Sequence, residues 1–254
     1  MAAAARMPLH RVIEQYDGAA VRCRTAADLL EITIAAAREL GFDRVALVHG
    51  LWFRQPGPGL IKLDNYGSYG ERFEERGYYR DDPVHLAGQR TNAPFAWDDL
   101  RRVIPWRDRH GEIMRDAELH GLRRGLSVPS NVLGEPPGVC SFATSASVLP
   151  SRWHRRAICL IGTTAFREAR RLWGFSKTAA TCPTVSPRKL EILRLAAMGK
   201  TDPEIAIILG LSASTVETYM RQLRQTFDVY SRTQLCIAAF RLGLLAFEDA
   251  MSGF

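Results

Sequence analysis

The sequence lacks the long apolar runs of a membrane protein. No window of its 254 residues reaches the roughly 18 consecutive apolar residues that a membrane-spanning helix needs. The opening residues, MAAAARMPLHRVIEQY, contain no apolar core of a secretory signal, so no signal peptide is expected. We therefore expect a cytoplasmic protein with no membrane partner.

Clustered metal-binding residues are also missing. The five cysteines form no CxxC pair, and the six histidines are scattered along the chain. A reducing compartment with mostly buried thiols is the expectation, and neither a metal site nor a cofactor is predicted. A single histidine such as His85 or His110 is more often a packed or surface residue than a ligand.

Catalytic signatures are absent as well. The sequence has no GxSxG, no HExxH, no phosphate loop and no Cys/His pair at a useful spacing. Ser127 and Ser141 have no assignable base. We therefore expect no enzyme, and the acidic pair, phosphoacceptor Asp and Lys of a response regulator are not visible either.

Acidic residues are outnumbered, but the excess of positive charge does not point to one segment. The net charge is +7, and residues 184–254 hold eight Lys or Arg and seven Asp or Glu, a net charge of +1. The first 183 residues therefore carry the remaining +6. This charge permits an anionic partner without locating it.

Apolar periodicity divides the chain into two parts. It is lost over 173–183, which is rich in small residues, and this predicts a linker between a domain at 1–172 and a second domain at 184–254. Clusters of Pro and Gly predict turns at 55–59 and 134–138.

The first part mixes helical and strand patterns. Residues 26–40 have Leu29, Ile32, Ala36 and Leu40 on one helical face, residues 67–79 carry aromatics and charges at helical spacing, and 151–172 predicts a long basic helix. Strands are predicted at 45–52, 126–129 and 139–143. This mixture predicts an α+β fold in which helices cover a sheet.

The second part predicts four helices. Ser186-Pro187 begins the first and Asp202-Pro203 the second, with a turn at Gly210. Ser212 caps a third helix over 213–227, and a fourth covers 232–242. The third helix has an apolar stripe formed by Val216, Met220, Leu223 and Phe227.

The other face of this third helix is polar. Its hydroxyls can hold phosphate and its Arg and Gln side chains can reach base edges, which is typical of a recognition helix in a major groove. A solvated helix face in a small bundle would show the same pattern, and periodicity alone does not choose between the two. The residues of this face are Ser214, Thr215, Glu217, Thr218, Arg221, Gln222, Arg224 and Gln225.

Residues 185–243 resemble the LuxR-type helix-turn-helix. The resemblance rests on Pro187-Arg188, Leu193, Gly199-Lys200-Thr201, Glu204-Ile205-Ala206, Leu209, Ser212, Thr215-Val216, Val229 and Arg232, all in register. Lys189, Tyr219 and Thr226-Phe227 depart from the family pattern. The resemblance implies double-stranded DNA as partner, bound by Lys200, Ser214, Thr215, Thr218, Arg221, Gln222 and Arg224.

The first 172 residues resemble the acyl-homoserine-lactone-binding domain of LuxR-type quorum-sensing regulators. The resemblance rests on 65–73 (NYGSYGERF), 77–83 (GYYRDDP), Phe95-Ala96-Trp97, Gly121-Leu122, Gly125 and Gly138. It implies an α/β/α sandwich around an antiparallel sheet, with the ligand between the sheet and one helical layer.

The same resemblance implies a ligand site. Asp82 would accept the amide N–H of the ligand, Tyr69 replaces a Trp that donates to the lactone carbonyl, and Phe73 replaces a Tyr that contacts the acyl carbonyl. Tyr66, Trp97 and Ser141 complete the expected site. A lost hydrogen bond to a buried ligand oxygen costs roughly 1–3 kcal/mol, so the two replacements indicate an unusual, branched or aryl, acyl group or another small molecule.

The prediction is a quorum-sensing regulator that binds an N-acyl-homoserine lactone and, as a homodimer, a pseudo-palindromic promoter site, with RNA polymerase as a further candidate partner. Two alternatives stay open. The chain could be a solo regulator that responds to a different molecule or acts without ligand. Its N-terminal domain could also contact a protein in place of a small molecule.

Overall fold

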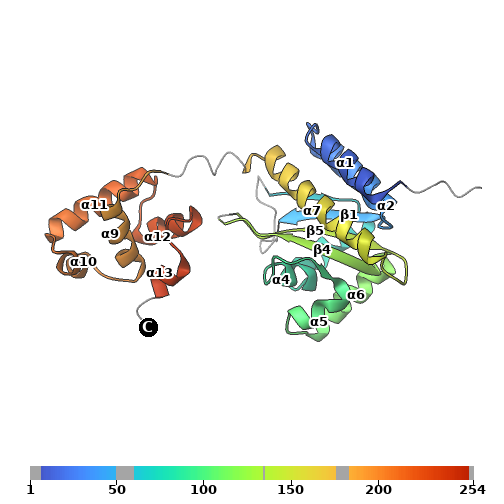
Figure 1. The fold of residues 1–254 in the computed structure, drawn as a ribbon. Coiled ribbons are helices and arrows are strands. Elements are labelled where there is room, and N and C mark those ends of the chain that lie inside the picture. The colour runs from blue at the N-terminus through green and yellow to red at the C-terminus, as the bar shows by residue number, and fades with distance from the viewer. Residues whose placement is uncertain (1–6, 50–59, 134, 176–182, 252–254) are drawn as a thin grey trace, which may run out of the picture. The chain divides into compact units, whose positions relative to one another are not determined.

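The computed structural model describes residues 7–49, 60–133, 135–175 and 183–251 (Figure 1). These residues form two compact units, one built from 7–132 and 136–175 and the other from 183–251. The predicted linker at 173–183 and the predicted turns at 55–59 and 134–138 fall wholly or partly outside the described residues. Trp173 and Phe175 pack against the core of the first unit, and the domain boundaries at 172 and 184 stay predictions.

A five-stranded antiparallel sheet forms the centre of the first unit. The strand order is β2 (Lys62–Asp64), β1 (Arg44–His49), β5 (Gly138–Thr144), β4 (Arg124–Ser130) and β3 (Phe95–Ala96). The strands predicted at 45–52, 126–129 and 139–143 correspond to β1, β4 and β5, and residues 50–52 lie outside the description. Strands β2 and β3 were not predicted, because two or three residues carry too little pattern to identify.

The two faces of this sheet differ in side-chain size. Alternate residues of a strand point to opposite faces, and the large ones, such as Leu47, Leu126 and Phe142, all belong to one core. The opposite face carries small residues, including Ala46, Gly125, Ser127, Ser141 and Ala143. Small side chains leave space above this face. The alternation of large and small residues along the strands therefore makes room for a cavity on one side of the sheet.

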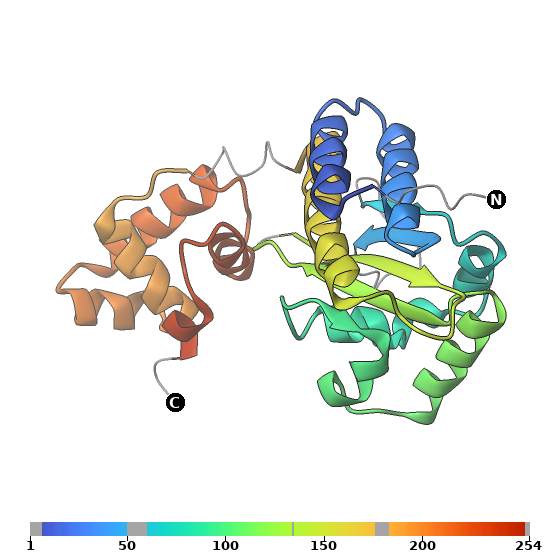
Figure 2. The same ribbon diagram turned by 45° about the vertical axis from the view of Figure 1, so that its right-hand side comes forward.

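Three helices cover the face with large side chains: α1 (Leu9–Ala20), α2 (Ala26–Glu39) and α7 (Arg152–Leu172) (Figure 2). The predicted helices at 26–40 and 151–172 correspond to α2 and α7. Thr25 forms a capping box with Asp28 at the start of α2, and Ser151 caps α7. Helix α1 was not predicted.

Short helices cover the other face. They are α3 (Ser68–Glu75), η1 (Tyr78–Arg80), α4 (Pro83–Gly88), η2 (Trp97–Asp99), α5 (Leu100–Val103) and α6 (Asp108–Leu119). Figure 1 shows α4, α5 and α6 on the side of the sheet away from α1, α2 and α7. The predicted α/β/α sandwich around an antiparallel sheet is confirmed.

The second unit is all-helical. It contains α9 (Pro187–Ala197), α10 (Asp202–Leu209), α11 (Ala213–Thr226), α12 (Arg232–Arg241) and α13 (Phe247–Met251). The four predicted helices are α9 to α12, with Ser186 and Ser212 as N-caps as expected. The structure adds the short α13, where Phe247 stacks on Phe240 with ring centroids 5.1 Å apart.

Candidate ligand cavity and nucleic-acid interface

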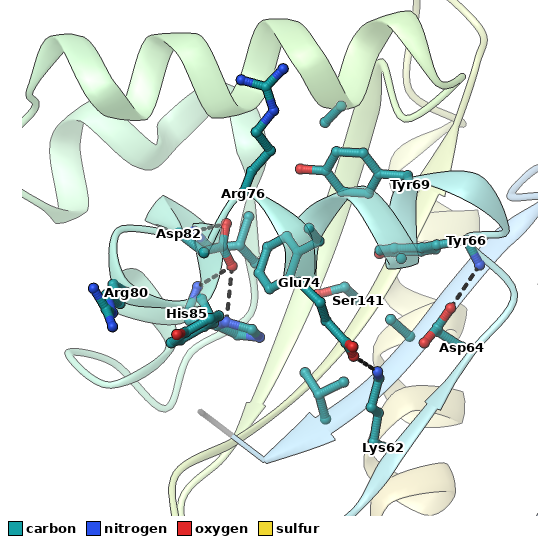
Figure 3. Close-up of a pocket in the computed structure, with 18 of the residues that line it drawn as sticks. Lys62, Asp64, Tyr66, Tyr69, Glu74, Arg76, Arg80, Asp82, His85 and Ser141 are labelled. Carbon is teal, nitrogen blue, oxygen red and sulfur yellow. Dashed lines mark hydrogen bonds and ion pairs between the residues drawn. The ribbon is translucent and has the colours of Figure 1, made fainter. Parts of the chain in front are cut away.

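A cavity of about 480 Å³ lies between the sheet and the layer of short helices (Figure 3). This volume falls within the range of small-molecule sites. All six residues that the sequence analysis assigned to ligand binding line it, although they come from α3, the segment before it, η2, β5 and the start of α4. They are Tyr66, Tyr69, Phe73, Asp82, Trp97 and Ser141.

Asp82 is a buried carboxylate at the start of α4. It is the N-cap residue, and its two oxygens accept from the backbone N–H of Val84 at 3.4 Å and of His85 at 3.1 Å. Pro83 at the first helical position needs no partner for its nitrogen. The long contact of Oδ1 with Val84 leaves this oxygen able to accept a further donor from the cavity.

Tyr66 and Tyr69 bring phenolic hydroxyls to the cavity. Burial raises the pKa of both phenols above the usual range, so both keep their protons and can donate. The hydroxyl of Tyr66 is buried and has no hydrogen-bond partner among the described residues. A buried hydroxyl without a partner is costly, and a ligand oxygen would satisfy it.

A chain of hydrogen bonds fixes the hydroxyl of Ser141. The indole Nε1–H of Trp97 donates to Ser127 Oγ at 2.9 Å, and Ser127 Oγ lies 2.8 Å from Ser141 Oγ on the neighbouring strand. Either hydroxyl can donate in the contact between the two serines. Ser127 is fully buried, and Ser141 Oγ is the acceptor that its proton can reach. The proton of Ser141 is then left to point into the cavity. Ser127 therefore positions a ligand-facing donor without lining the cavity itself.

A buried ionic cluster holds the helical wall of the cavity. Asp116 of α6 accepts from Arg72 Nε of α3 at 2.6 Å and from the hydroxyl of Tyr78 at 2.7 Å. The Arg72 hydrogen bond holds the pKa of Asp116 below its usual value. Helix α3 carries Tyr69 and Phe73, so this cluster positions both of them.

Sequence reasoning missed several residues of the cavity. His85 lines it, although a lone histidine was expected to be a packed or surface residue, and the rim carries further charged groups. Lys62 of β2 forms an ion pair with Glu74 of α3, as Figure 3 shows. The sequence did contain a signal for His85: it lies three residues after Asp82, within one helical turn, and so on the same side of the helix. The charged rim residues had none. These rim residues are Lys62, Asp64, Glu74, Glu75, Arg76 and Arg80.

In the second unit, α10 and α11 form a helix-turn-helix. Gly210 ends α10 with φ of 64°, a left-handed conformation that favours glycine. A capping box between Thr201 and Glu204 begins α10, and Ser212 caps α11. Two arginines hold the unit together: Arg188 donates to the carbonyl of Leu209 at 2.5 Å, and Arg232 pairs with Asp202.

The polar face predicted on α11 is present. Val216, Met220 and Leu223 are buried and Phe227 is half-buried, which turns the opposite side outward. Thr215, Thr218, Arg221 and Gln222 lie within about a third of the helix circumference at roughly 100° per residue. Ser214 and Thr215 contact the cap Ser212 through their hydroxyls, at 2.9 and 2.7 Å. Half-buried Arg224 lies at the edge of this face, and half-buried Lys200 precedes α10.

No helix within the described ranges is long and apolar enough to cross a bilayer. Over the same part of the chain, no three His, Cys, Asp or Glu side chains lie close enough to hold a metal ion.

The two units define the class of the protein: an α/β/α domain with a cavity between its sheet and one helical layer, joined in one chain to a helix-turn-helix. Residues 25–169 match the Autoinducer binding domain family, and residues 183–239 match the luxR family of bacterial regulatory proteins. The chain belongs to the LuxR-type regulators that carry an autoinducer-binding domain.

Individual relatives agree with this family. The chain is 28% identical to the quorum-sensing regulator RhlR of Pseudomonas aeruginosa over 82% of this chain and 86% of that protein. It is 27% identical to the putative regulator y4qH of Sinorhizobium fredii over 69% of this chain, a match that spans only 53% of that relative. The fold is similar to that of Escherichia coli SdiA, with a TM-score of 0.64, 23% identity and coverage of 94% and 100% of the two chains.

Proposed function

We propose that this protein is a transcriptional regulator that binds an N-acyl-homoserine lactone in the cavity of its first unit and DNA through α11. The observation that carries the proposal is the convergence of six residues, chosen from the sequence, on one cavity of suitable size. RhlR, a relative along most of its length, is a quorum-sensing regulator, and the family is not a class of enzymes.

The polar groups of the cavity complement such a ligand. The free lone pairs of Asp82 accept the amide N–H of the ligand, and the Tyr69 hydroxyl donates to the lactone carbonyl. Phe73 has no hydroxyl to offer the acyl carbonyl, but the unpartnered hydroxyl of Tyr66 and the oriented proton of Ser141 supply donors in its place. Trp97 packs against the lactone ring.

DNA binding would use the outer face of α11. Thr215 and Thr218 contact phosphates and Arg221 and Gln222 reach base edges, in the way of helix-turn-helix proteins. A homodimer would place two such helices in successive major grooves of a pseudo-palindromic site. In the cytoplasm, the regulator bound to its promoter site would then influence the recruitment of RNA polymerase.

Thermal denaturation with a panel of acyl-homoserine lactones tests the ligand assignment. A lactone that binds the folded state raises the melting temperature of the wild type with increasing concentration. In Asp82→Asn the side-chain amide presents an N–H to the amide N–H of the ligand, where the carboxylate accepts a hydrogen bond. The rise in melting temperature should therefore disappear. Asp81→Asn is the matched control, because this neighbouring carboxylate does not line the cavity, and it should keep the full shift.

Three results would contradict the proposal. An equal shift in wild type, Asp82→Asn and Asp81→Asn would mean that the ligand lies elsewhere. A shift with other small molecules but with no lactone would favour the solo-regulator alternative. The absence of any shift, together with binding of a protein from the native host to the first unit, would favour a protein-contacting domain.

A further inference from the structure

His85 is a buried polar side chain in the wall of the cavity, beside the carboxylate of Asp82. Its side chain is 11% exposed, and it lines the cavity together with Phe73 and Val84. The His85 and Phe73 rings meet edge to face, with centroids 6.0 Å apart and an interplanar angle of 88°. An aliphatic residue would fill this position without the cost of burying an imidazole. The imidazole therefore needs hydrogen-bond partners for both of its nitrogens. Among the described residues, Asp82 lies next to one nitrogen, and no partner is present for the other.

Asp82 determines which nitrogen of the imidazole carries the proton. His85 Nδ1 lies 3.1 Å from Asp82 Oδ2, and Figure 3 draws the two side chains next to each other. Nδ1 has no aligned hydrogen-bond partner among the described residues, but the carboxylate is the polar group next to it. Because a carboxylate can only accept, its position favours a proton on Nδ1.

In the neutral form of the ring with the proton on Nδ1, Nε2 is a hydrogen-bond acceptor. No hydrogen bond to Nε2 is present among the described residues, and the ring lines the cavity. A hydrogen-bond donor on the ligand would satisfy this nitrogen.

An N-acyl-homoserine lactone with a plain alkyl chain has one donor, its amide N–H. In the proposed function Asp82 accepts this N–H, and the lactone and acyl oxygens can only accept hydrogen bonds. A second donor must come from a substituent on the acyl group. A hydroxyl is the simplest such group. The rest of the acyl group can pack against the rings of Phe73 and Tyr79, which also line the cavity.

From this geometry we infer that His85 is a specificity residue that selects a ligand whose acyl group carries a hydroxyl. The inference rests on the proposed function and deepens it. Both a hydroxylated alkyl chain and a phenolic acyl group provide this chemistry. The shared requirement is one O–H donor facing Nε2 of His85.

Calorimetric titration with matched ligand pairs tests the inference. One pair is N-(3-hydroxyoctanoyl)- and N-octanoyl-homoserine lactone, and the other is the 4-hydroxyphenylacetyl and phenylacetyl lactones. For one pair, the wild type should bind the hydroxylated member about tenfold more tightly, the effect of one hydrogen bond to a buried group. The pair that shows the preference identifies the alkyl or the aryl source of the hydroxyl.

Variants of His85 connect the preference to this residue. His85→Leu should bind both members of the pair with equal affinity, whereas His85→Gln, whose amide oxygen can accept, should keep part of the preference. His120→Leu is the histidine control: its ring contacts Tyr69 but does not line the cavity, so the preference should remain.

The outcomes separate this inference from the proposed function. If lactones bind the wild type but neither hydroxylated member is preferred, the inference about His85 is wrong and the proposed function stands. The same conclusion follows if His85→Leu keeps the wild-type preference. If no lactone of either pair binds the wild type, both are overturned.

Discussion

Tyr66 and Tyr78 both have hydroxyls in the interior of the first unit, but the two hydroxyls differ in their partners. That of Tyr66 has none among the described residues, and that of Tyr78 donates to Asp116 at 2.7 Å. From this difference we infer that the Tyr66 hydroxyl contributes to ligand binding, whereas the Tyr78 hydroxyl stabilises the fold.

Replacing each tyrosine by phenylalanine should therefore give opposite results. Tyr66→Phe should leave the melting temperature of the free protein unchanged or higher, because no hydrogen bond is lost, and should weaken lactone binding by roughly 1–3 kcal/mol. Tyr78→Phe should lower the stability of the free protein and weaken lactone binding less than Tyr66→Phe does, because Asp116 keeps its hydrogen bond from Arg72. Thermal melts and calorimetric titrations of the two variants provide the check, and a loss of stability in Tyr66→Phe would contradict this assignment.

At this scale the sequence predicted which residues line the cavity but not all of their roles. Asp82 before Pro83 and the aromatics of 65–73 could be recognised from short motifs. The missing hydroxyl of Phe73 suggested a lost contact, whereas the structure offers the hydroxyl of Tyr66. The support of Ser141 by Ser127 could not be predicted, because it depends on the strand register that pairs the two residues.

At the scale of elements, Gly125 shows how the sheet accommodates η2. A Cβ atom at this position would lie 2.3 Å from the indole of Trp97, far inside contact distance. Only glycine lets Trp97 pack flat on β4 and donate to Ser127.

Gly125→Ala should displace Trp97, lower the stability of the first unit by about 1–3 kcal/mol and weaken ligand binding, with a red shift of tryptophan emission. Gly111→Ala is the control, since its Cβ would first meet the flexible end of Arg115 at 3.3 Å. It lies within helix α6, where alanine is favoured over glycine by up to about 1 kcal/mol. Equal effects of the two substitutions would contradict the packing argument.

The attachment of α3 to α6 predicts a dependence on pH. Because the pKa of Asp116 is held below its ordinary value of 3.8 in the folded state, its contribution to stability is present above that pH. This contribution is lost as the pH falls through the lowered folded-state pKa.

Asp116→Asn should accordingly destabilise the first unit by about 1–3 kcal/mol at neutral pH, and the difference from wild type should shrink as the pH falls below the ordinary carboxyl pKa of 3.8. All five tryptophans lie at or before residue 173, so urea unfolding followed by tryptophan fluorescence reports on this unit. Glu112→Gln, at an exposed pair with Arg109, should have little effect. A difference that stays constant with pH would argue against the ion pair as its cause.

Among the elements, most of the longer helices were predicted, whereas α1, α6 and most of the short elements were not. Helices α2, α7 and α9 to α12 show apolar periodicity over several turns and have Ser or Thr caps. Elements such as β2, β3, α4 and α5 are two to six residues long, and their conformation depends on packing over the sheet. These short elements surround the cavity, so the sequence indicated the site mainly through its resemblance to a family.

At the scale of the whole molecule, the distribution of charge limits how the chain can hold DNA. The 71 residues from 184 onward have a net charge of only +1, so affinity must depend on a few well-placed contacts more than on a general field. Arg221 is the exposed arginine on the outer face of α11.

Arg221→Ala should weaken binding to the cognate site by about 1–3 kcal/mol and reduce discrimination against a random duplex. Arg102→Ala removes the same charge from the exposed surface of α5 in the other unit and should change neither quantity much. Fluorescence anisotropy with cognate and random duplexes measures both. Unchanged discrimination in Arg221→Ala would remove this residue from base recognition.

Mass spectrometry of the small molecules that co-purify with the protein shows whether the cavity of the first unit binds an acyl-homoserine lactone through Asp82. Wild type and Asp82→Asn would be purified from the native host and extracted in parallel. We expect an acylated homoserine lactone, with a hydroxylated acyl group, in the wild-type extract and not in that of the variant. A bound molecule without a lactone ring, or equal amounts of lactone in both extracts, would contradict it.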